Sequence, residues 1–264
     1  MASIKIHPSE FAYAFAYAKA KDIVGWGYEP FSPTFDDADI PTEWFSDGEA
    51  RMIAAGRLIG TSEEGMNFTD ELSSAILALV KPSLVLMAER RSGDEVQRLT
   101  VHVAGSDLIG LTLGVDGLFE LVRYTEMTAA AGACVGFLGA SLTPLFEESR
   151  IDTDMKTLTT LHKFSGSSPE KAQKALVLLG LSESAAISAV NTLAEPQSSG
   201  MLSVLYCADN EVQDAEAISV LTSVQDHTWI LFQPASVDGP MILERSAASA
   251  LTARVSVGIA ARLG

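Results

Sequence analysis

Residues 108–138 read LIGLTLGVDGLFELVRYTEMTAAAGACVGFL, and part of this stretch recurs in the last 30 or so positions of the sequence. Val115-Asp116-Gly117 returns as Val237-Asp238-Gly239, an offset of 122 residues. The same offset pairs five more identical residues: Leu121 with Leu243, Arg123 with Arg245, Ala131 with Ala253, Val135 with Val257 and Gly136 with Gly258. These eight identities over positions 115–138 predict two copies of one strand–turn–strand–helix unit.

Short apolar runs bounded by turn residues surround the repeated unit. The first set is typical of an antiparallel meander followed by a helix, with strands expected at 83–90, 97–104, 108–113 and 118–124 and the helix at 125–138. Leu99, Val101 and Val103 alternate with Thr100 and His102, which indicates a sheet with one buried face. The second set repeats this order, with strands expected at 201–207, 215–224, 228–232 and 241–245 and a helix at 246–263.

Three helices are expected between the two sets of strands, at 155–164, 169–179 and 183–194. Ser168 is a candidate N-cap of the second helix, and Gly180 is placed to end it. The predicted fold is α+β: a quasi-twofold, duplicated antiparallel sheet flanked by helices, with an inserted helical bundle. We expect one compact domain over 1–264, with pseudo-repeat halves at 68–138 and 168–263 and an aromatic and acidic segment at 1–60.

The N-terminal segment leaves two questions open. Residues 11–18 alternate aromatic residues with alanine, which fits either a strand or a helix, and in both cases core packing is the simplest role. Residues 25–47 combine six aromatic residues with prolines and acidic residues, so they either wrap over the body of the protein or present the aromatics to a partner. Ser46 and Glu49 form a capping-box pattern that predicts a helix over 49–59, and Thr69 is expected to cap a helix over 70–80.

The composition narrows the class of protein. Apolar residues make up 47% of the 264 residues and charged residues 20%, so a sizeable core is available. A net charge of −16 leaves no basic surface for phosphate groups, and we expect neither nucleic-acid binding nor membrane insertion. Cys134 and Cys207 are too few for a disulfide framework, and the first ten residues lack the pattern of a secretory signal. We therefore expect a cytoplasmic protein with buried free thiols.

Familiar catalytic motifs do not occur in the sequence. There is no glycine-rich phosphate loop, no G-x-S-x-G and no H-E-x-x-H, and the four histidines and two cysteines lack metal-ligand spacing. Asp226-His227 beside Ser223 is better explained as a polar turn, and Asp152 and Asp154 as residues that favour a helix N-terminus. We expect no enzyme, no metal and no cofactor; an enzyme with an unfamiliar pocket near Trp229 stays an alternative.

The order of elements from about Ser83 onward resembles the EspG-type chaperones of type VII (ESX) secretion systems. The resemblance lies in the repeated units ending in Leu121-Val122-Arg123 and Leu243-Glu244-Arg245, the helices at 153–194 and the strand–helix ending at 241–263. It implies a cytosolic chaperone that binds the helical tip of a PPE-like secreted protein in a PE/PPE heterodimer and keeps it soluble for export. We expect the protein to be a monomer or homodimer. The alternative hypothesis for a binding protein is a type III secretion chaperone-like protein.

The same resemblance implies where the partner binds. By position, the contact surfaces are the hairpin loop and the inserted helices, and the expected partner-binding residues are Ser92, Gly93, Asp94, Glu95, Val96, Leu158, Leu161, Leu176, Leu179 and Trp229. The aromatic segment at 11–45 departs from the family pattern.

Overall fold

The computed structural model describes residues 3–20, 22–27, 29–31, 42–60, 67–92, 95–143, 149–209, 211–225, 227–233 and 240–263. Ten strands form one sheet in the order β1-β7-β6-β5-β4-β9-β10-β11-β12-β8, and helices flank it, so the predicted α+β class with a large antiparallel sheet is confirmed. The chain divides into two compact units, one formed by 1–86, 99–130 and 205–215 and the other by 87–98, 131–204 and 216–264.

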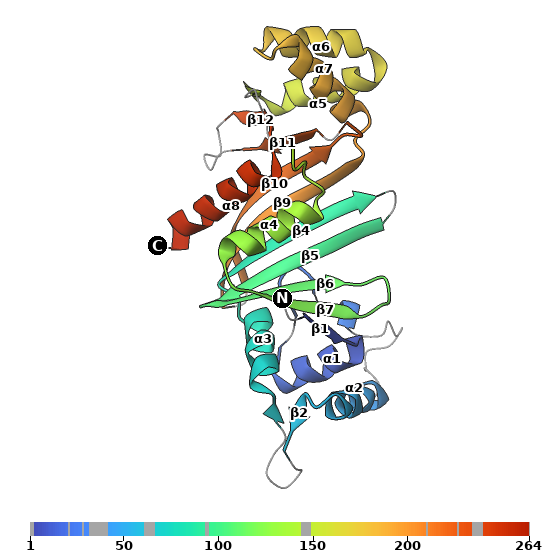
Figure 1. Cartoon of the computed structure of the whole chain (residues 1–264), viewed down its shortest axis with the longest axis vertical. Helices are drawn as coiled ribbons and strands as arrows, with labels where there is room; N and C mark the ends of the chain where they lie inside the picture. Colours follow the sequence, from blue (N-terminus) through green and yellow to red (C-terminus); the bar gives the residue numbers. More distant parts are fainter. Residues whose placement is uncertain are drawn as a thin grey trace. The chain divides into compact units, whose positions relative to one another are not determined.

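The elements follow the predicted order closely (Figure 1). The sheet strands are β1 (Ser3–Ile6), β4 (Leu84–Ser92), β5 (Glu95–Ala104), β6 (Asp107–Leu113), β7 (Phe119–Tyr124), β8 (Arg150–Thr153), β9 (Ser198–Ala208), β10 (Glu211–Thr222), β11 (Thr228–Phe232) and β12 (Met241–Arg245). The helices are α1 (Pro8–Tyr17), α2 (Thr42–Ala54), α3 (Asp70–Val80), α4 (Met127–Phe137), α5 (Met155–Ser167), α6 (Pro169–Leu178), α7 (Glu183–Ala194) and α8 (Ala248–Leu263). A two-stranded sheet, β2 (Leu58–Ile59) with β3 (Asn67–Phe68), completes the described regular structure.

The order of one helix, four strands and one helix occurs twice, as α3-β4-β5-β6-β7-α4 and as α7-β9-β10-β11-β12-α8. The repeated arginines nevertheless have different surroundings. Arg123 donates hydrogen bonds to Asp107 and Ser74, whereas Nε of Arg245 is buried without a hydrogen-bond partner in the described part of the chain. The duplication itself stays a prediction, because residues 237–239 lie outside the described residues.

An aromatic core fills the first unit. Phe119 on β7 contacts Phe11 and Phe31, with ring centroids 5.3 Å and 4.6 Å away, and Phe11 stacks on Phe15 at 5.2 Å. Leu111 and Leu121, which face each other in the β6–β7 register, belong to the same core. Residues 11–18 are therefore mostly helical, because Phe11 and Phe15, one turn apart, lie on the same buried face.

The segment around residues 25–47 packs on this core where it is described. Phe31 is fully buried, and Nε1 of Trp26 donates a hydrogen bond of 2.8 Å to Thr100 on β5. Nε1 of Trp44 donates to the carbonyl of Phe31 at 3.2 Å. The wrapping interpretation is confirmed for these three aromatic residues; Phe35 and the acidic cluster 36–39 lie outside the described residues.

The predicted helix over 49–59 is wrong at both ends. The helix α2 spans Thr42–Ala54, so Ser46 lies inside it and does not cap it. The capping box of this region lies at α1, where the His7 side chain accepts from a backbone N–H of the first turn and the Glu10 side chain accepts from the backbone N–H of His7. After α2 the chain turns at Gly56, whose φ is +65°, and Leu58 enters β2. Sequence reasoning also missed the edge strands β1 and β8, because runs of four residues give little periodicity.

In the second unit, β12 pairs with β11 on one side and with β8 on the other. The three predicted inserted helices are confirmed as α5, α6 and α7, which pack against one another (Figure 1). Asp154 caps α5 as expected, accepting a hydrogen bond of 2.7 Å from the backbone N–H of Thr157, whereas Asp152 lies in β8. On α8, Leu251, Val255 and Ile259 are spaced by four residues and form one buried side.

Candidate partner-binding site

The predicted hairpin site lies between β4 and β5. Gly93 and Asp94 lie outside the described residues, and Ser92 is the last residue of β4. Glu95 and Val96 begin β5, and the side chain of Val96 is 52% exposed. Further along, Arg98 pairs with Glu89 at 2.6 Å and Nη2 of Arg90 donates to Gln97 at 2.9 Å. These cross-strand pairs hold the hairpin in register up to its exposed end.

Most of the leucines predicted to bind a partner form the core between α5, α6 and α7. Leu158 and Leu161 on α5 and Leu176 on α6 are 7%, 2% and 0% exposed. They pack in one cluster with Ala172, Leu181 and Ala186. Their role in this structure is to hold the three helices together, which determines the side chains that the helices expose.

One apolar surface of this helical group lies at the end of α6. Val177, Leu178 and Leu179 are 38%, 87% and 40% exposed, and we call these three residues the α6 tip. A helix has 3.6 residues per turn, so the four consecutive apolar residues Leu176–Leu179 cannot all face the core. Leu176 faces inward and the other three do not. That run was the signal by which the sequence could have identified Val177 and Leu178 in addition to Leu179.

A surface hollow of about 630 Å³ adjoins the α6 tip. Its lining combines apolar and charged side chains: Glu170, Gln173, Lys174, Val177, Leu178 and Glu183. Gly180, with a φ of +112°, allows the chain to leave α6 directly after the tip, and Ser182 caps the following helix by accepting from the backbone N–H of Ala185. The result is an apolar projection with a charged rim, the composition that protein interfaces show at their centre and edge.

Trp229, the remaining predicted site residue, is fully buried in the second unit. Its Nε1 donates a hydrogen bond of 3.1 Å to Oγ of Ser188 on α7, and Oγ of Ser188 lies 2.8 Å from Nδ1 of His227. Ser188 is 4% exposed, so this serine–histidine pair links α7 to β11 in the interior and is closed to a substrate. The backbone N–H of His227 donates to Oγ of Ser223, as expected for a turn, and Asp226 lies outside the described residues.

Among the described residues, no group of three or more histidine, cysteine, aspartate or glutamate side chains is placed to hold a metal ion. None of the described helices is both long enough and apolar enough to cross a bilayer.

Comparisons with known proteins identify a similar fold. No protein-family model matches the sequence, and no curated protein matches it. Among solved structures, the chain is similar to the Mycobacterium tuberculosis type VII secretion system chaperone EspG5, solved in complex with a PE25–PPE41 dimer. The TM-score is 0.64 and the sequence identity 12%, and the match covers 97% of this chain and 95% of EspG5.

Proposed function

We propose that this protein is a cytosolic chaperone of a type VII secretion system that binds the helical tip of a PE/PPE-like heterodimer and keeps it soluble for export. The likeness to EspG5 extends over nearly the whole of both chains, which supports a shared architecture rather than a shared motif. The negative net charge of −16 fits the role, because a strongly charged chaperone keeps a complex with an apolar client dispersed.

The observation that carries this proposal is the exposed α6 tip. Leu178 is 87% exposed, so this side chain contributes little to the stability of the chaperone. Covering a leucine fully is worth about 1.5–3 kcal/mol, so Leu178 can contribute substantially to binding an apolar helical tip. The charged side chains Glu170, Lys174 and Glu183 around it would orient the client.

The end of the β4–β5 hairpin is proposed as the second contact. It comprises Ser92–Val96, of which Glu95 and Val96 are exposed in the structure. The buried residues Leu158, Leu161, Leu176 and Trp229 then act indirectly, by fixing the positions of the helices that carry the α6 tip.

The binding test compares two leucines of equal exposure. Leu178→Glu places a charge on the α6 tip, and Leu142→Glu places one at a residue that is 85% exposed in a loop of the same unit. We expect Leu178→Glu to weaken binding of the PE/PPE-like heterodimer from the same genome by about tenfold or more, measured by isothermal titration calorimetry. Thermal unfolding should be unchanged in both variants, and Leu142→Glu should bind as the wild type does. Equal affinities for the two variants would reject the α6 tip as the site.

A second test addresses the hairpin. The double charge reversal Asp94→Lys with Glu95→Lys should lower the affinity for the same heterodimer, because it reverses the charge of the proposed contact segment. The unfolding temperature should not change, because Glu95 is exposed at the start of β5. An affinity equal to that of the wild type would remove Ser92–Val96 from the proposed contact surface.

A further inference from the structure

The strand β8 is one of the two terminal strands of the large sheet. In the described part of the chain it pairs with β12 alone, in an antiparallel register that places Ile151 opposite Leu243. Two residues along each strand, the backbone N–H of Arg245 donates a hydrogen bond of 2.8 Å to the carbonyl of Ser149. One side of β8 is thus hydrogen-bonded to the sheet, and the other side is an edge.

The register determines which backbone groups of β8 lie on this edge. Hydrogen-bonded pairs alternate along an antiparallel ladder, so Ser149, Ile151 and Thr153 direct their backbone groups toward β12. The N–H and C=O groups of Arg150 and Asp152 therefore point away from the sheet. Within the residues that the structure describes, these outward groups have no hydrogen-bond partner. They can accept another strand.

The other terminal strand, β1, is covered at the corresponding place. Nη2 of Arg57 donates a hydrogen bond of 2.6 Å to the backbone carbonyl of Lys5, so a side chain of the protein already occupies an acceptor of this strand. Of the two terminal strands, β8 is the one whose edge is open to a further strand.

The side chains at the β8 edge carry one charge of each sign. Arg150 and Asp152 lie on the same side of the strand and are 51% and 57% exposed, whereas Ile151 between them is buried against the α5–α7 core. Edge strands are commonly protected by lysines, whose like charges repel a second copy of the same strand. A positive and a negative residue two positions apart have the opposite effect, because they match a copy that runs in the reverse direction.

We propose that β8 pairs with β8 of a second copy of this chain, antiparallel and centred on Ile151, to form a homodimer. In this register Arg150 of each copy lies opposite Asp152 of the other. These are the residues whose backbone groups point outward, so each pair exchanges two backbone hydrogen bonds and brings opposite charges across from each other.

Other registers are less favourable. A register in which Arg150 lies opposite Arg150, or Asp152 opposite Asp152, brings like charges together. A register in which Arg150 lies opposite Thr153 loses the hydrogen bonds, because the backbone groups of Thr153 face β12. The favoured contact is symmetric and uses the same strand of both copies, so assembly ends at the dimer.

Sedimentation-velocity ultracentrifugation of the full-length protein tests the proposal. At about 0.15 M salt, charges more than about 8 Å apart are screened, which limits the repulsion between two copies of net charge −16. A contact this small is weak, so we expect the average mass to rise from monomer toward dimer between about 10 and about 500 µM protein. A wild-type protein that stays monomeric throughout this range would overturn the proposal and leave the edge to a strand of another protein.

Charge reversals test the register. Arg150→Asp leaves two acidic residues at the edge and Asp152→Arg leaves two basic residues, so each variant alone should dimerise about tenfold or more weakly than the wild type. An equimolar mixture of the two variants should regain the wild-type affinity, because every cross-strand pair then joins opposite charges. The mixture also shows that both variants are folded. Lys163→Glu makes the same change of net charge as Arg150→Asp at an exposed residue of α5, and it should dimerise as the wild type does.

Single variants that dimerise like the wild type, or a mixture that stays monomeric, would overturn the proposal. Amide hydrogen exchange shows whether the backbone takes part. The N–H groups of Arg150 and Asp152 should exchange about tenfold or more slowly at the highest protein concentration than at the lowest, whereas that of Ile151, which faces β12, should not change. Equal exchange at both concentrations would also overturn the proposal. The result is independent of the proposed chaperone function, because neither the α6 tip nor the hairpin end belongs to this edge.

Discussion

Nη1 of Arg57 lies 2.7 Å from Oε1 of Glu10, whose side chain is only 6% exposed. The other oxygen of Glu10 accepts a hydrogen bond of 2.7 Å from the backbone N–H of His7, and Nη2 of Arg57 donates to the carbonyl of Lys5 at 2.6 Å. This one ion pair therefore joins the end of β1, the first turn of α1 and the chain just before β2.

Removing Arg57 should destabilise the protein strongly. Arg57→Ala leaves the Glu10 carboxylate buried without its cation, and breaking a buried pair in this way costs about 3 kcal/mol. Urea unfolding should show this loss. The control is Arg51→Ala, whose partner Asp47 is 41% exposed, and it should cost at most about 1 kcal/mol. Equal losses in the two variants would show that burial does not set the strength of the Arg57 pair.

Gly48 should be the least replaceable glycine among the described helices. It lies where α2 crosses α1, and a Cβ atom there would lie 2.1 Å from the backbone oxygen of Ser9. Gly48→Ala should therefore cost about 3 kcal/mol or more, because the obstacle is backbone. Gly258→Ala on α8 meets open space and should stabilise the protein by about 0.5–1 kcal/mol. Urea unfolding of the two variants measures both changes in the free energy of unfolding. Changes of the same sign would contradict the expected difference between the two glycines.

Lys19→Gly should raise the stability of the free protein. The positive φ of residue 19 costs a lysine about 1 kcal/mol relative to glycine, so the melting temperature should rise by about 2–4 °C. Gly56→Ala makes the opposite change at the equivalent position after α2, where an added Cβ meets nothing, and should lower the melting temperature by a similar amount. Scanning calorimetry checks both. A lower melting temperature for Lys19→Gly would mean that its side chain stabilises the end of α1.

His102 should make the protein sensitive to mild acid. The ring is fully buried on β5, and burial lowers its pKa from 6.5 to about 3. A histidine with a lowered folded-state pKa stays neutral in the fold while the unfolded chain takes up a proton, so its contribution to stability is complete above pH 6.5 and declines as the pH falls toward 3. Between pH 7 and pH 5 the loss should be about 2 kcal/mol.

The pH dependence of urea unfolding tests this expectation. His102→Leu should lower the overall stability, because Thr100 loses its partner at 2.9 Å, but the loss between pH 7 and pH 5 should become smaller by about 2 kcal/mol. An unchanged slope in His102→Leu would assign the acid sensitivity to other groups.

The two cysteines should react very differently with a thiol reagent. Cys134 on α4 is fully buried, and burial raises the pKa of its thiol to about 12, so neither access nor ionisation favours reaction. Cys207 on β9 is half-buried, and burial raises its pKa as well. In the native protein, Cys134→Ser should keep the labelling rate of the wild type, and Cys207→Ser should show almost no labelling. Rapid labelling of Cys207→Ser would indicate that α4 opens readily.

The elements themselves could largely be predicted from the sequence. Alternation in residues 99–103, the proline at the start of α6 and the spacing of Leu251, Val255 and Ile259 are local signals, and each corresponds to an observed strand or helix. The start of α2 could not be found in this way, because Ser46 and Glu49 imitate a cap while they lie inside the helix. Local sequence patterns indicate which secondary structure a segment favours, and several segments fit more than one pattern.

The arrangement of the α6 site was only partly accessible from sequence. The apolar run 176–179 shows that some of its members must be exposed, but only packing shows that Leu176 enters the core and that Val177, Leu178 and Leu179 remain outside. Leu158 and Leu161 on α5 are also leucines on a helix of this group, yet both are buried. The sequence shows how many apolar side chains a helix carries, whereas the elements that pack against the helix determine which of these side chains are covered.

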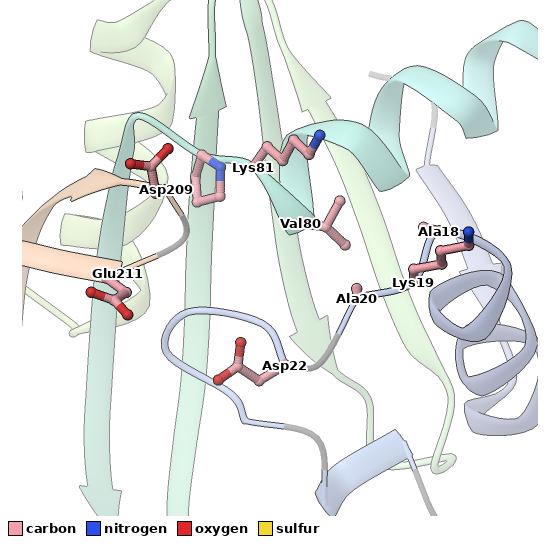
Figure 2. Close-up of a pocket in the computed structure, with 9 residues that line it drawn as sticks. Ala18, Lys19, Ala20, Asp22, Val80, Lys81, Asp209 and Glu211 are labelled. Atoms are coloured by element: carbon pink, nitrogen blue, oxygen red, sulfur yellow. The ribbon is translucent and has the colours of Figure 1, made fainter.

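By itself, then, the sequence determined the α+β class, the order of strands and helices and the absence of the familiar catalytic motifs, because these depend on local periodicity and residue type. Only the tertiary structure decided which charges pair and which residues remain accessible. Glu10 and Arg57 are 47 residues apart, and Lys19 and Asp209, which line one cleft (Figure 2), are 190 residues apart in the sequence. Such contacts join segments that are distant in sequence, and the energies that select them arise when those segments are packed together.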